Sequence, residues 1–404
     1  MAVLKLNNVT TITESSGAIT ITPNTTASGN LTVTGTSTLT GNATASGNLT
    51  VTGDLVPSTP LSHRNMIING GMQVSQRNGT SSFAFTNGTF GTDRWKYNGD
   101  SSRLTAQQVA DAPADFHYSL KLASVGNNSP GATAGSGMWM QLEGDDVTRL
   151  SYGTASAKTV TLSFWVKSSI AGNFGGAFSN GAMNRAYPFT FPVTTSWNRV
   201  SITIAGDTTG TWVTSGNGYG LRVILNSACG SNFNGSSAGA WVGADRRDVS
   251  GTVQLEATSG ATLNITGVQL ELGSSATPFE HRSYGDELLR CQRYYNKSYN
   301  TGVFAGAVTA VGAIVGWPGL ATGTNMISGA AGRFPVRMRA IPTVSIYDPA
   351  GGIGTVRTYS AGGGSTDSIG TNSGFINESG IGYRTFNIGE VYQFEYHYTA
   401  NSEL

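Results

Sequence analysis

Charged residues are scarce in this chain. Lysine and arginine contribute 24 residues and aspartate and glutamate 23, so only 12% of the 404 residues are charged and the net charge is +1. The sequence contains no basic cluster of the kind that binds nucleic acid and no polybasic run that would attract an anionic membrane. We therefore expect neither a nucleic acid partner nor membrane insertion.

Cysteines, closely spaced histidines and long apolar runs are also lacking. Cys229 and Cys291 lie in no CxxC motif and cannot form a disulfide framework, so we interpret both as small buried residues. The four histidines show neither HxH nor HExxH spacing, which argues against a metal centre. The longest apolar stretch, near Ala310 to Trp317, is interrupted by glycines and is too short to cross a bilayer.

Glycine, serine, threonine and asparagine are abundant, and the 38% of apolar residues recur in short alternating runs. Helical periodicity is almost absent, apart from a short helix predicted at Tyr284–Arg290 with Leu288 and Leu289 turned inward. The pattern predicts an all-β protein. Candidate strands of its middle region are Ile67–Ile68, Met72–Val74, Phe83–Phe85, Asp93–Tyr97, Tyr118–Ala123, Met138–Leu142, Thr159–Lys167, Trp197–Ile204, Tyr219–Leu225 and Leu263–Leu272.

The last third carries a second set of candidate strands, of which Tyr392–Tyr398 is the most informative. It places its aromatic residues on one face, which has to be covered by its own domain or by a neighbouring subunit. The other candidates are Gln292–Tyr299, Val308–Val315, Thr343–Tyr347 and Gly382–Asn387. Residues 348–383 are rich in glycine, serine and threonine, and we interpret them as long loops on a β-scaffold.

An identical decapeptide, TASGNLTVTG, occupies residues 26–35 and 44–53. Its apolar residues, such as Leu31 and Leu49, are too few to offset the backbone entropy of a lone chain, about 1–2 kcal/mol per ordered residue. Several chains wound together would also supply the missing hydrogen-bond partners. We predict an intertwined β-shaft of three chains over residues 23–60, and a flexible Thr/Gly/Ser linker is the alternative.

Several motifs together resemble the carbohydrate-binding-module-like region of bacteriophage tail fibre proteins. They cover roughly residues 63–295, and FPVRMR (334–339) with IPT (341–343) extends the similarity. The motifs are HRNMIINGGM (63–72), TDRW (92–95), TLSFWVK (161–167), GVQLELGSSATPFEHRSY (267–284) and CQRYY (291–295). The resemblance implies host recognition by a protein attached to a virion, and it does not identify the ligand.

The repeat, the motifs and the strand pattern together predict four segments. Residues 1–22 form a virion attachment segment, with a frayed terminus as the alternative, and residues 23–60 form the shaft. Residues 61–283 form a jelly-roll carbohydrate-binding-like domain, and residues 284–404 form a C-terminal β-sandwich knob.

Aromatic side chains are the best candidates for ligand contact, because sugars stack their apolar C–H faces on flat rings. Trp139 and Trp165 alternate outward from jelly-roll strands, although packing beneath loops is the commoner role of tryptophan. Tyr359, Phe375 and Tyr383 lie in the glycine-rich part of the knob. The knob is farthest along the chain from the attachment segment, so we place specificity there, with the jelly-roll face as the competing site.

No residue is predicted to be catalytic. A glycosidase needs two carboxylates facing one another across a sugar, and the acids here are explained by turns and outward strand positions. The acids considered are Glu143, Asp145, Asp146, Glu256, Glu271 and Glu280. No cofactor is expected, except that Asp93 or Asp145 would help to hold a structural Ca²⁺ of the kind that jelly-roll sugar-binding modules often contain.

These observations predict a homotrimeric bacteriophage tail fibre protein that attaches the virion to bacterial surface polysaccharide without cleaving it. Its N-terminal segment would be held by another tail protein or adaptor. Met1 to Asn7 contains no apolar core of a signal peptide, so we expect assembly in the host cytoplasm and a final location in the virion tail. A glycan-degrading tailspike and a purely structural virion appendage are the alternatives.

The repeat leads to a prediction about mass. The protein should have a mass in solution of about 126 kDa, three times the 42.0 kDa of one chain. Leu31→Asp together with Leu49→Asp should loosen the N-terminal region, because each change places an unpaired carboxylate on an apolar seam. Light scattering after size exclusion measures both, and a clean monomer at micromolar concentration would contradict the shaft.

Overall fold

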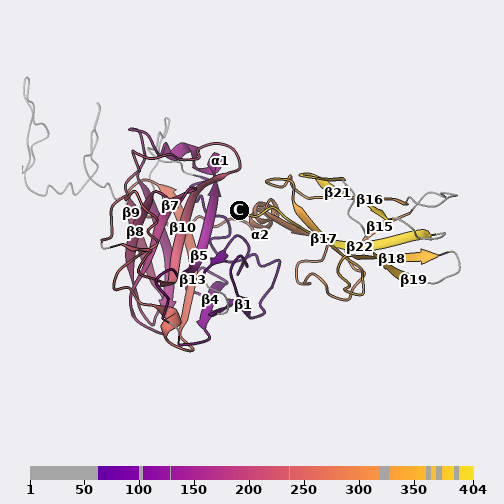
Figure 1. Ribbon diagram of the computed structural model, residues 1–404, viewed down its shortest axis with the longest axis horizontal. Coiled ribbons are helices and arrows are strands. Elements are labelled where there is room, and N and C mark those ends of the chain that lie inside the picture. Colours follow the sequence, from indigo (N-terminus) through magenta and orange to yellow (C-terminus); the bar gives the residue numbers. More distant parts are fainter. Residues whose placement is uncertain are drawn as a thin grey trace, which may run out of the picture. The chain divides into compact units, whose positions relative to one another are not determined.

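The computed structural model describes most of the chain after residue 61. The described residues are 62–99, 103–127, 129–235, 237–317, 327–360, 365–369, 375–385 and 391–404. The predicted attachment segment and shaft lie outside these residues. Within them strands predominate, which confirms the all-β prediction (Figure 1). No helix of the described residues is long and apolar enough to span a membrane.

The first lobe is a sandwich of two antiparallel sheets. The six-stranded sheet has the order β1 (Phe83–Phe85), β3 (Leu104–Val109), β4 (Ser119–Ser124), β13 (Thr262–Leu272), β6 (Val160–Ser168) and β9 (Asn198–Ile204). The five-stranded sheet has the order β2 (Lys96–Asn98), β5 (Gly135–Glu143), β10 (Tyr219–Cys229), β7 (Gly172–Asn180) and β8 (Ala186–Val193). From β4 to β13 the chain passes repeatedly from one sheet to the other, as in a jelly roll.

Short elements connect these strands. They are α1 (Gly144–Val147), the 3₁₀ turns η1 (Thr148–Leu150) and η2 (Leu255–Ala257), and the parallel pair β11 (Asn234–Gly235) with β12 (Asp248–Val249). The predicted strands Ile67–Ile68 and Met72–Val74 do not form. The chain turns between them, since Asn69 and Met72 have positive φ and the Met72 amide donates to the Asn69 carbonyl.

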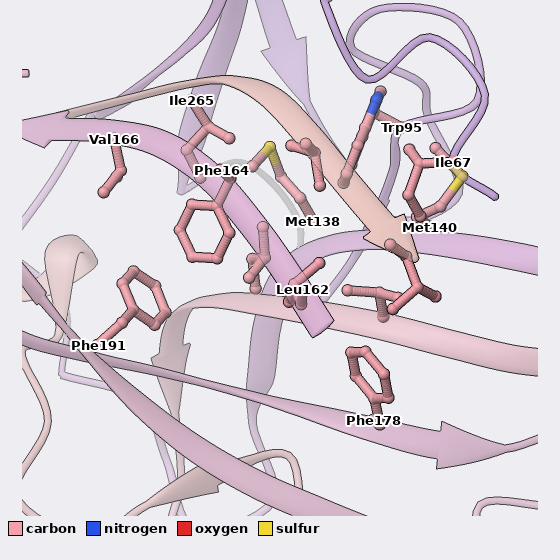
Figure 2. Close-up of a cluster of buried hydrophobic side chains, with 14 of the residues drawn as sticks. Ile67, Trp95, Met138, Met140, Leu162, Phe164, Val166, Phe178, Phe191 and Ile265 are labelled. Carbon is pink, nitrogen blue, oxygen red and sulfur yellow. The ribbon is translucent and has the colours of Figure 1, made fainter. Parts of the chain in front are cut away.

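The core of this lobe lies between the two sheets. Phe164 and its β6 neighbours Leu162 and Val166 lie at this core, together with side chains from the five-stranded sheet such as Phe191 (Figure 2). The rings of Phe164 and Phe191 pack edge to face, with their centres 5.0 Å apart. Full burial of such side chains stabilises the lobe by about 1.5–3 kcal/mol each.

A β-bulge in β13 keeps its apolar residues on the core side. The register with β6 shifts between Thr266 and Gln269, where Gly267 has a φ of +62°. Ile265 before the bulge and Val268 after it are both fully buried, although they are three positions apart in the chain. Without the inserted residue, the alternation of a strand would turn one of the two outward.

After β13 the chain crosses the outer face of the six-stranded sheet and enters α2 (Tyr284–Gln292). Ser283 caps this helix, since its hydroxyl accepts from the Asp286 amide. The predicted helix is therefore confirmed. Leu288 is partly buried, whereas Leu289 is 44% exposed and was wrongly predicted to face inward.

The second lobe is organised around β22 (Val391–Asn401). One half of β22 pairs with β14 and β17, and the other half pairs with β15 and β18 (Figure 1). The strands are β14 (Tyr295–Lys297), β15 (Ile314–Gly316), β16 (Ile327–Arg333), β17 (Thr343–Tyr347), β18 (Thr355–Ser360), β19 (Ser365–Ile369), β20 (Phe375–Asn377) and β21 (Gly380–Thr385). Phe394, Tyr396 and Tyr398 are buried against residues of the same lobe, so this aromatic face needs no neighbouring subunit.

Glycine content misled two of the sequence predictions. In the described part of residues 348–383 strands predominate over long loops, and Val356 and Thr358 alternate inward from β18 and are almost fully buried. The sandwich strand β7 was missed for the same reason. Its glycines are required by close packing against neighbouring strands and do not mark turns. A Cβ on Gly176 would come within 2.3 Å of the Ile224 carbonyl oxygen.

The predicted strand Val308–Val315 is wrong over most of its length. Only Ile314–Gly316 forms a strand, namely β15. Gly306 and Gly312 have φ values of +81° and +88°, so they turn the chain on both sides of Val308 and Val311.

The chain terminus connects the two lobes. Glu403 forms ion pairs with Arg94 and Arg77, and the guanidinium of Arg94 lies 3.4 Å from the ring centre of Tyr294. Arg293 and Tyr294 in turn donate hydrogen bonds to Glu143 at the end of β5. The side chains of Arg94 and Glu403 are 2% and 5% exposed, so this ion pair is shielded from solvent.

This shielding predicts a large effect on stability. Arg94→Ala should lower the free energy of unfolding by about 3–5 kcal/mol, because it leaves a buried carboxylate short of its partner. Arg337→Ala is the control, since the Arg337 side chain is 74% exposed and its pair with Glu378 should contribute no more than about 1 kcal/mol. Chemical denaturation measures the free energy of unfolding of both variants. Similar losses of stability would contradict a buried ion pair between Arg94 and Glu403.

Candidate functional site

Four aromatic side chains gather on the outer face of the six-stranded sheet. Trp165 of β6 points away from the core and is half-buried, beside Phe116, Phe279 and His281. The ring centres of Phe116, Phe279 and His281 are 4.9–5.3 Å apart. We call these four residues the Trp165 platform. Sequence analysis identified Trp165 and missed the other three, which come from loops far apart in the chain.

Gly267 joins the tryptophan to the rest of the platform. A Cβ at this position would lie 2.6 Å from Phe116 and 3.0 Å from Trp165, so both rings pack directly on the glycine backbone. The segment that carries Phe279 is held down by β13, because the amide and hydroxyl of Thr277 donate to Glu271 and the Glu280 amide donates to Gln269. The platform is therefore built by the bulge and by two buried polar side chains of one strand.

Polar groups border the platform on β6 and β9. The Lys167 ammonium lies 2.6 Å from the Asp111 carboxylate and 5.2 Å from the ring centre of Trp197, whose indole nitrogen donates to Asp111. Arg199, opposite Trp165 in the sheet, donates to the Thr277 carbonyl. Asp111 is exposed, so its carboxylate is open to solvent beside the rings. Flat rings next to charged groups of both signs suit a polyhydroxylated ligand.

A cavity of about 640 Å³ adjoins the platform at His281. It lies along α2, and its lining is dominated by arginines and small polar residues. The lining includes His63, Glu280, His281, Arg282, Asp286, Arg290, Arg293 and Arg337. Arg282 forms ion pairs with Glu280 and Glu287, and Arg293 forms one with Glu143. These carboxylates fix the two arginines in the cavity wall and offset part of their positive charge.

Trp139 has a different environment. It is 3% exposed, and the guanidinium carbons of Arg222 and Arg247 lie 5.8 Å and 5.3 Å from its ring centre. Arg247 also lies over Phe233, in the segment that joins β10 to β12. In this arrangement the indole has no free face to offer a sugar.

The three aromatic residues predicted in the second lobe are not all in one sheet. Tyr359 lies on β18 and donates to Glu395 on β22 at 2.6 Å; this hydrogen bond, with a smaller effect of burial, raises the pKa of the phenol. Phe375 and Tyr383 lie on β20 and β21 of a separate three-stranded sheet, and their side chains lie outside the described residues.

The candidate acids hold the structure together. Glu143 accepts hydrogen bonds from Arg293 and Tyr294, and Glu256 is fully buried beside Ser227, with burial raising the pKa of its carboxyl. Burial alone would raise the pKa of Glu280, but the amides of Asn65 and Arg64 donate to it and bring its pKa below the ordinary value.

Among the remaining acids, Asp93 and Asp145 accept hydrogen bonds, whereas burial and the neighbouring Glu143 carboxylate raise the pKa of Asp146. Asp145 accepts from the Gly216 amide, and Asp93 accepts from the amide and side chain of Gln76. In the part of the chain that the structure describes, no group of three or more His, Cys, Asp or Glu side chains is placed to hold a metal ion. Both cysteines are buried and free, and burial raises the pKa of Cys229 to about 12.

The comparisons with known proteins found weak structural likenesses. No family model and no curated protein sequence matches the chain. It is similar to the enzymatically active domain of bacteriophage CBA120 tailspike protein 4, with 14% identity and a TM-score of 0.29, over 52% of this chain and 21% of the tailspike chain. The matched part therefore spans about a fifth of that structure.

Carbohydrate-binding modules are similar at the same level. The family 11 module from Clostridium thermocellum has 10% identity and a TM-score of 0.26, and covers 50% of this chain and 100% of its own. The CBM22-1 xylan-binding domain from Paenibacillus barcinonensis Xyn10C has 10% identity and a TM-score of 0.25, and covers 49% and 99%. Likeness of this degree does not identify a ligand for this chain.

The packing at Gly267 predicts a specific effect of adding one methyl group. Gly267→Ala and Gly260→Ala both place alanine at positive φ, which costs about 1–3 kcal/mol. Only Gly267→Ala also meets the two rings, which should add about 1–3 kcal/mol of overpacking, whereas nothing lies within 4 Å at Gly260. Denaturant unfolding of the two variants gives the difference, and equal losses would mean that the rings move aside freely.

Proposed function

We propose that this chain is a receptor-binding tail fibre protein of a bacteriophage, which attaches the virion to bacterial surface polysaccharide and does not cleave it. The Trp165 platform is the observation that carries the proposal. It is a half-exposed group of rings on the outer face of a rigid sheet, bordered by polar groups and open to solvent. The motif resemblance at residues 63–295 supplies the virion context.

The chemistry of the platform favours a sugar over other ligands. Rings of this kind bind the C–H face of a pyranose, and the carboxylate of Asp111 and the ammonium of Lys167 can exchange their mutual bond for bonds to hydroxyl groups. The cavity at His281 extends the surface toward α2, so that a chain of several sugars would contact both. A nucleic acid would need a denser positive surface than this chain provides.

Binding without cleavage is supported by the state of the acids. A glycosidase needs one carboxyl group free to donate a proton and a second free to attack the sugar or activate water. Near the platform, Glu271 is 2% exposed and accepts from Gln269 and Thr277, and Glu280 accepts from backbone amides. Asp111 is exposed and hydrogen-bonded to Lys167 and Trp197, so of these three acids it alone could act on a sugar, and a glycosidase needs two.

A single platform of this size would bind weakly. A homotrimer held by its N-terminal shaft and anchored to another tail protein would present three platforms at once. The second and third contacts are then intramolecular, which raises overall avidity without any new contact. This arrangement suits a virion that has to hold a polymeric surface.

The proposal predicts that loss of the platform rings abolishes binding while the fold remains. Phe279→Ala and Trp165→Ala should each weaken binding to the recognised polysaccharide at least tenfold in a panel of purified bacterial surface polysaccharides, because each removes stacking area. Phe304→Ala is the matched control, since this ring is 40% exposed but belongs to the second lobe. Circular dichroism checks that each variant folds.

The same binding measurements separate the alternative functions. If Tyr359→Ala abolishes binding and the platform variants do not, the site lies in the second lobe. If no polysaccharide binds, the chain is a structural appendage. Shortening of the polysaccharide during long incubation, abolished by Asp111→Asn or Glu271→Gln, would identify a glycan-degrading tailspike.

A further inference from the structure

The second lobe contains a long stretch without any charged residue. From Ser298 through Gly332, 35 consecutive residues include no Asp, Glu, Lys or Arg. At the chain's average of 12%, about four would be expected. The stretch also contains the longest apolar run of the sequence, from Ala310 to Trp317, so a buried position would be the ordinary expectation.

Several apolar side chains in the described part of this stretch lie in solvent. Val308 is 80% exposed, Val311 64% and Trp317 68%, and Ile353 on a neighbouring turn is 76% exposed. Val315 adds a side chain that is 41% exposed. We call these five residues the valine face. No other part of the described chain exposes large apolar side chains to this degree so close together in sequence.

The contacts of the second lobe bring these residues to one side of β22. The Thr309 carbonyl lies 2.9 Å from Nε2 of His397, and Val315 pairs with Glu395, so both contact the side of β22 opposite the core residues Phe394 and Tyr396. The Thr309 amide donates to the Pro349 carbonyl, which draws the loop of Val308 toward the turn that precedes Ile353.

An exposed apolar surface of this kind is unusual for a single soluble chain. Isolated exposed valines are ordinary, but several large apolar side chains exposed on one side of a lobe mark a surface that another molecule covers. Exposed strands and loops that remain in water are normally protected by lysine or other charges, and this stretch has none.

We infer that the valine face is covered by a second copy of this chain, so that the second lobe is itself part of the oligomer interface. The inference rests on the trimeric assembly of the proposed function. Interfaces between permanently associated copies are apolar at their centre, as these five side chains are. A polysaccharide would instead need hydrogen-bonding groups, and the five side chains offer only the indole nitrogen of Trp317.

The N-terminal repeat gives an independent reason to choose a second copy as the partner. The apolar residues of the decapeptide are too few to order a lone chain, which favours several chains wound together. Such a shaft would keep the second lobes of its copies at high local concentration. The valine face would then be buried each time the protein assembles. A different virion protein, or another part of the same chain, remains as an outcome of the test.

Cysteine labelling of the full-length protein tests whether the face is covered. Val308→Cys and Val311→Cys are compared with Val125→Cys, a valine of the sandwich lobe that is 54% exposed. The two native thiols are buried, so they contribute little background. We expect a maleimide to label the two valine-face variants at least tenfold more slowly than the control, in a sample whose mass is a multiple of 42.0 kDa.

Three results would overturn the inference. Labelling as fast as that of Val125→Cys would show an open face, and slow labelling in a monomer would show that the chain covers itself. Val308→Asp with Val311→Asp should raise the dissociation constant of the oligomer at least tenfold, whereas Val125→Asp should leave it unchanged. An oligomer that tolerates both aspartates as well as the parent would also contradict the inference.

The test is independent of glycan binding. If the interface inference fails, each chain still binds polysaccharide through the Trp165 platform. If the proposed function fails, no polysaccharide binds, but the labelling rates and the mass are unchanged. Binding measured on the aspartate variants separates the two cases, because loss of the interface should reduce avidity and leave the affinity of a single chain unaltered.

Discussion

The bulge at Gly267 is the constraint on which the rest of the structure depends. It allows β13 to pair with both β4 and β6 while Ile265 and Val268 stay in the core. The same strand then presents Gln269 and Glu271 outward, and these two side chains hold the segment that leads to α2 and the second lobe. The Trp165 platform, the cavity beside it and the path of the chain all follow from that local distortion.

Several of the few charges of this protein are used inside it. Arg94 with Glu403, and Glu143 with Arg293, connect the lobes at buried or partly buried positions, where an unpaired charge would be costly. The outer face of the six-stranded sheet carries the rings of the Trp165 platform with charged neighbours of both signs, and the second lobe carries the valine face.

Some of this could be predicted from the sequence and some could not, for identifiable reasons. Alternation of apolar residues predicted most strands of the sandwich, and the outward position of Trp165 followed from its place between Phe164 and Val166. Phe116 could not be assigned to the same site as Phe279 and His281, because its loop lies more than 150 residues away from theirs in the chain. Trp139 satisfied the same pattern as Trp165, and only the arginines packed over it distinguish the two.

The sequence by itself determined the all-β class, the sandwich strands with clear alternation and the short helix after β13, because these depend on local periodicity and on caps such as Ser283. Tertiary structure decided which outward-facing residues are covered. Trp139 lies beneath Arg222 and Arg247, whereas Val308 and Val311, which belong to the most apolar part of the sequence, lie in solvent. Burial depends on contacts between segments far apart in the chain, and no local pattern encodes them.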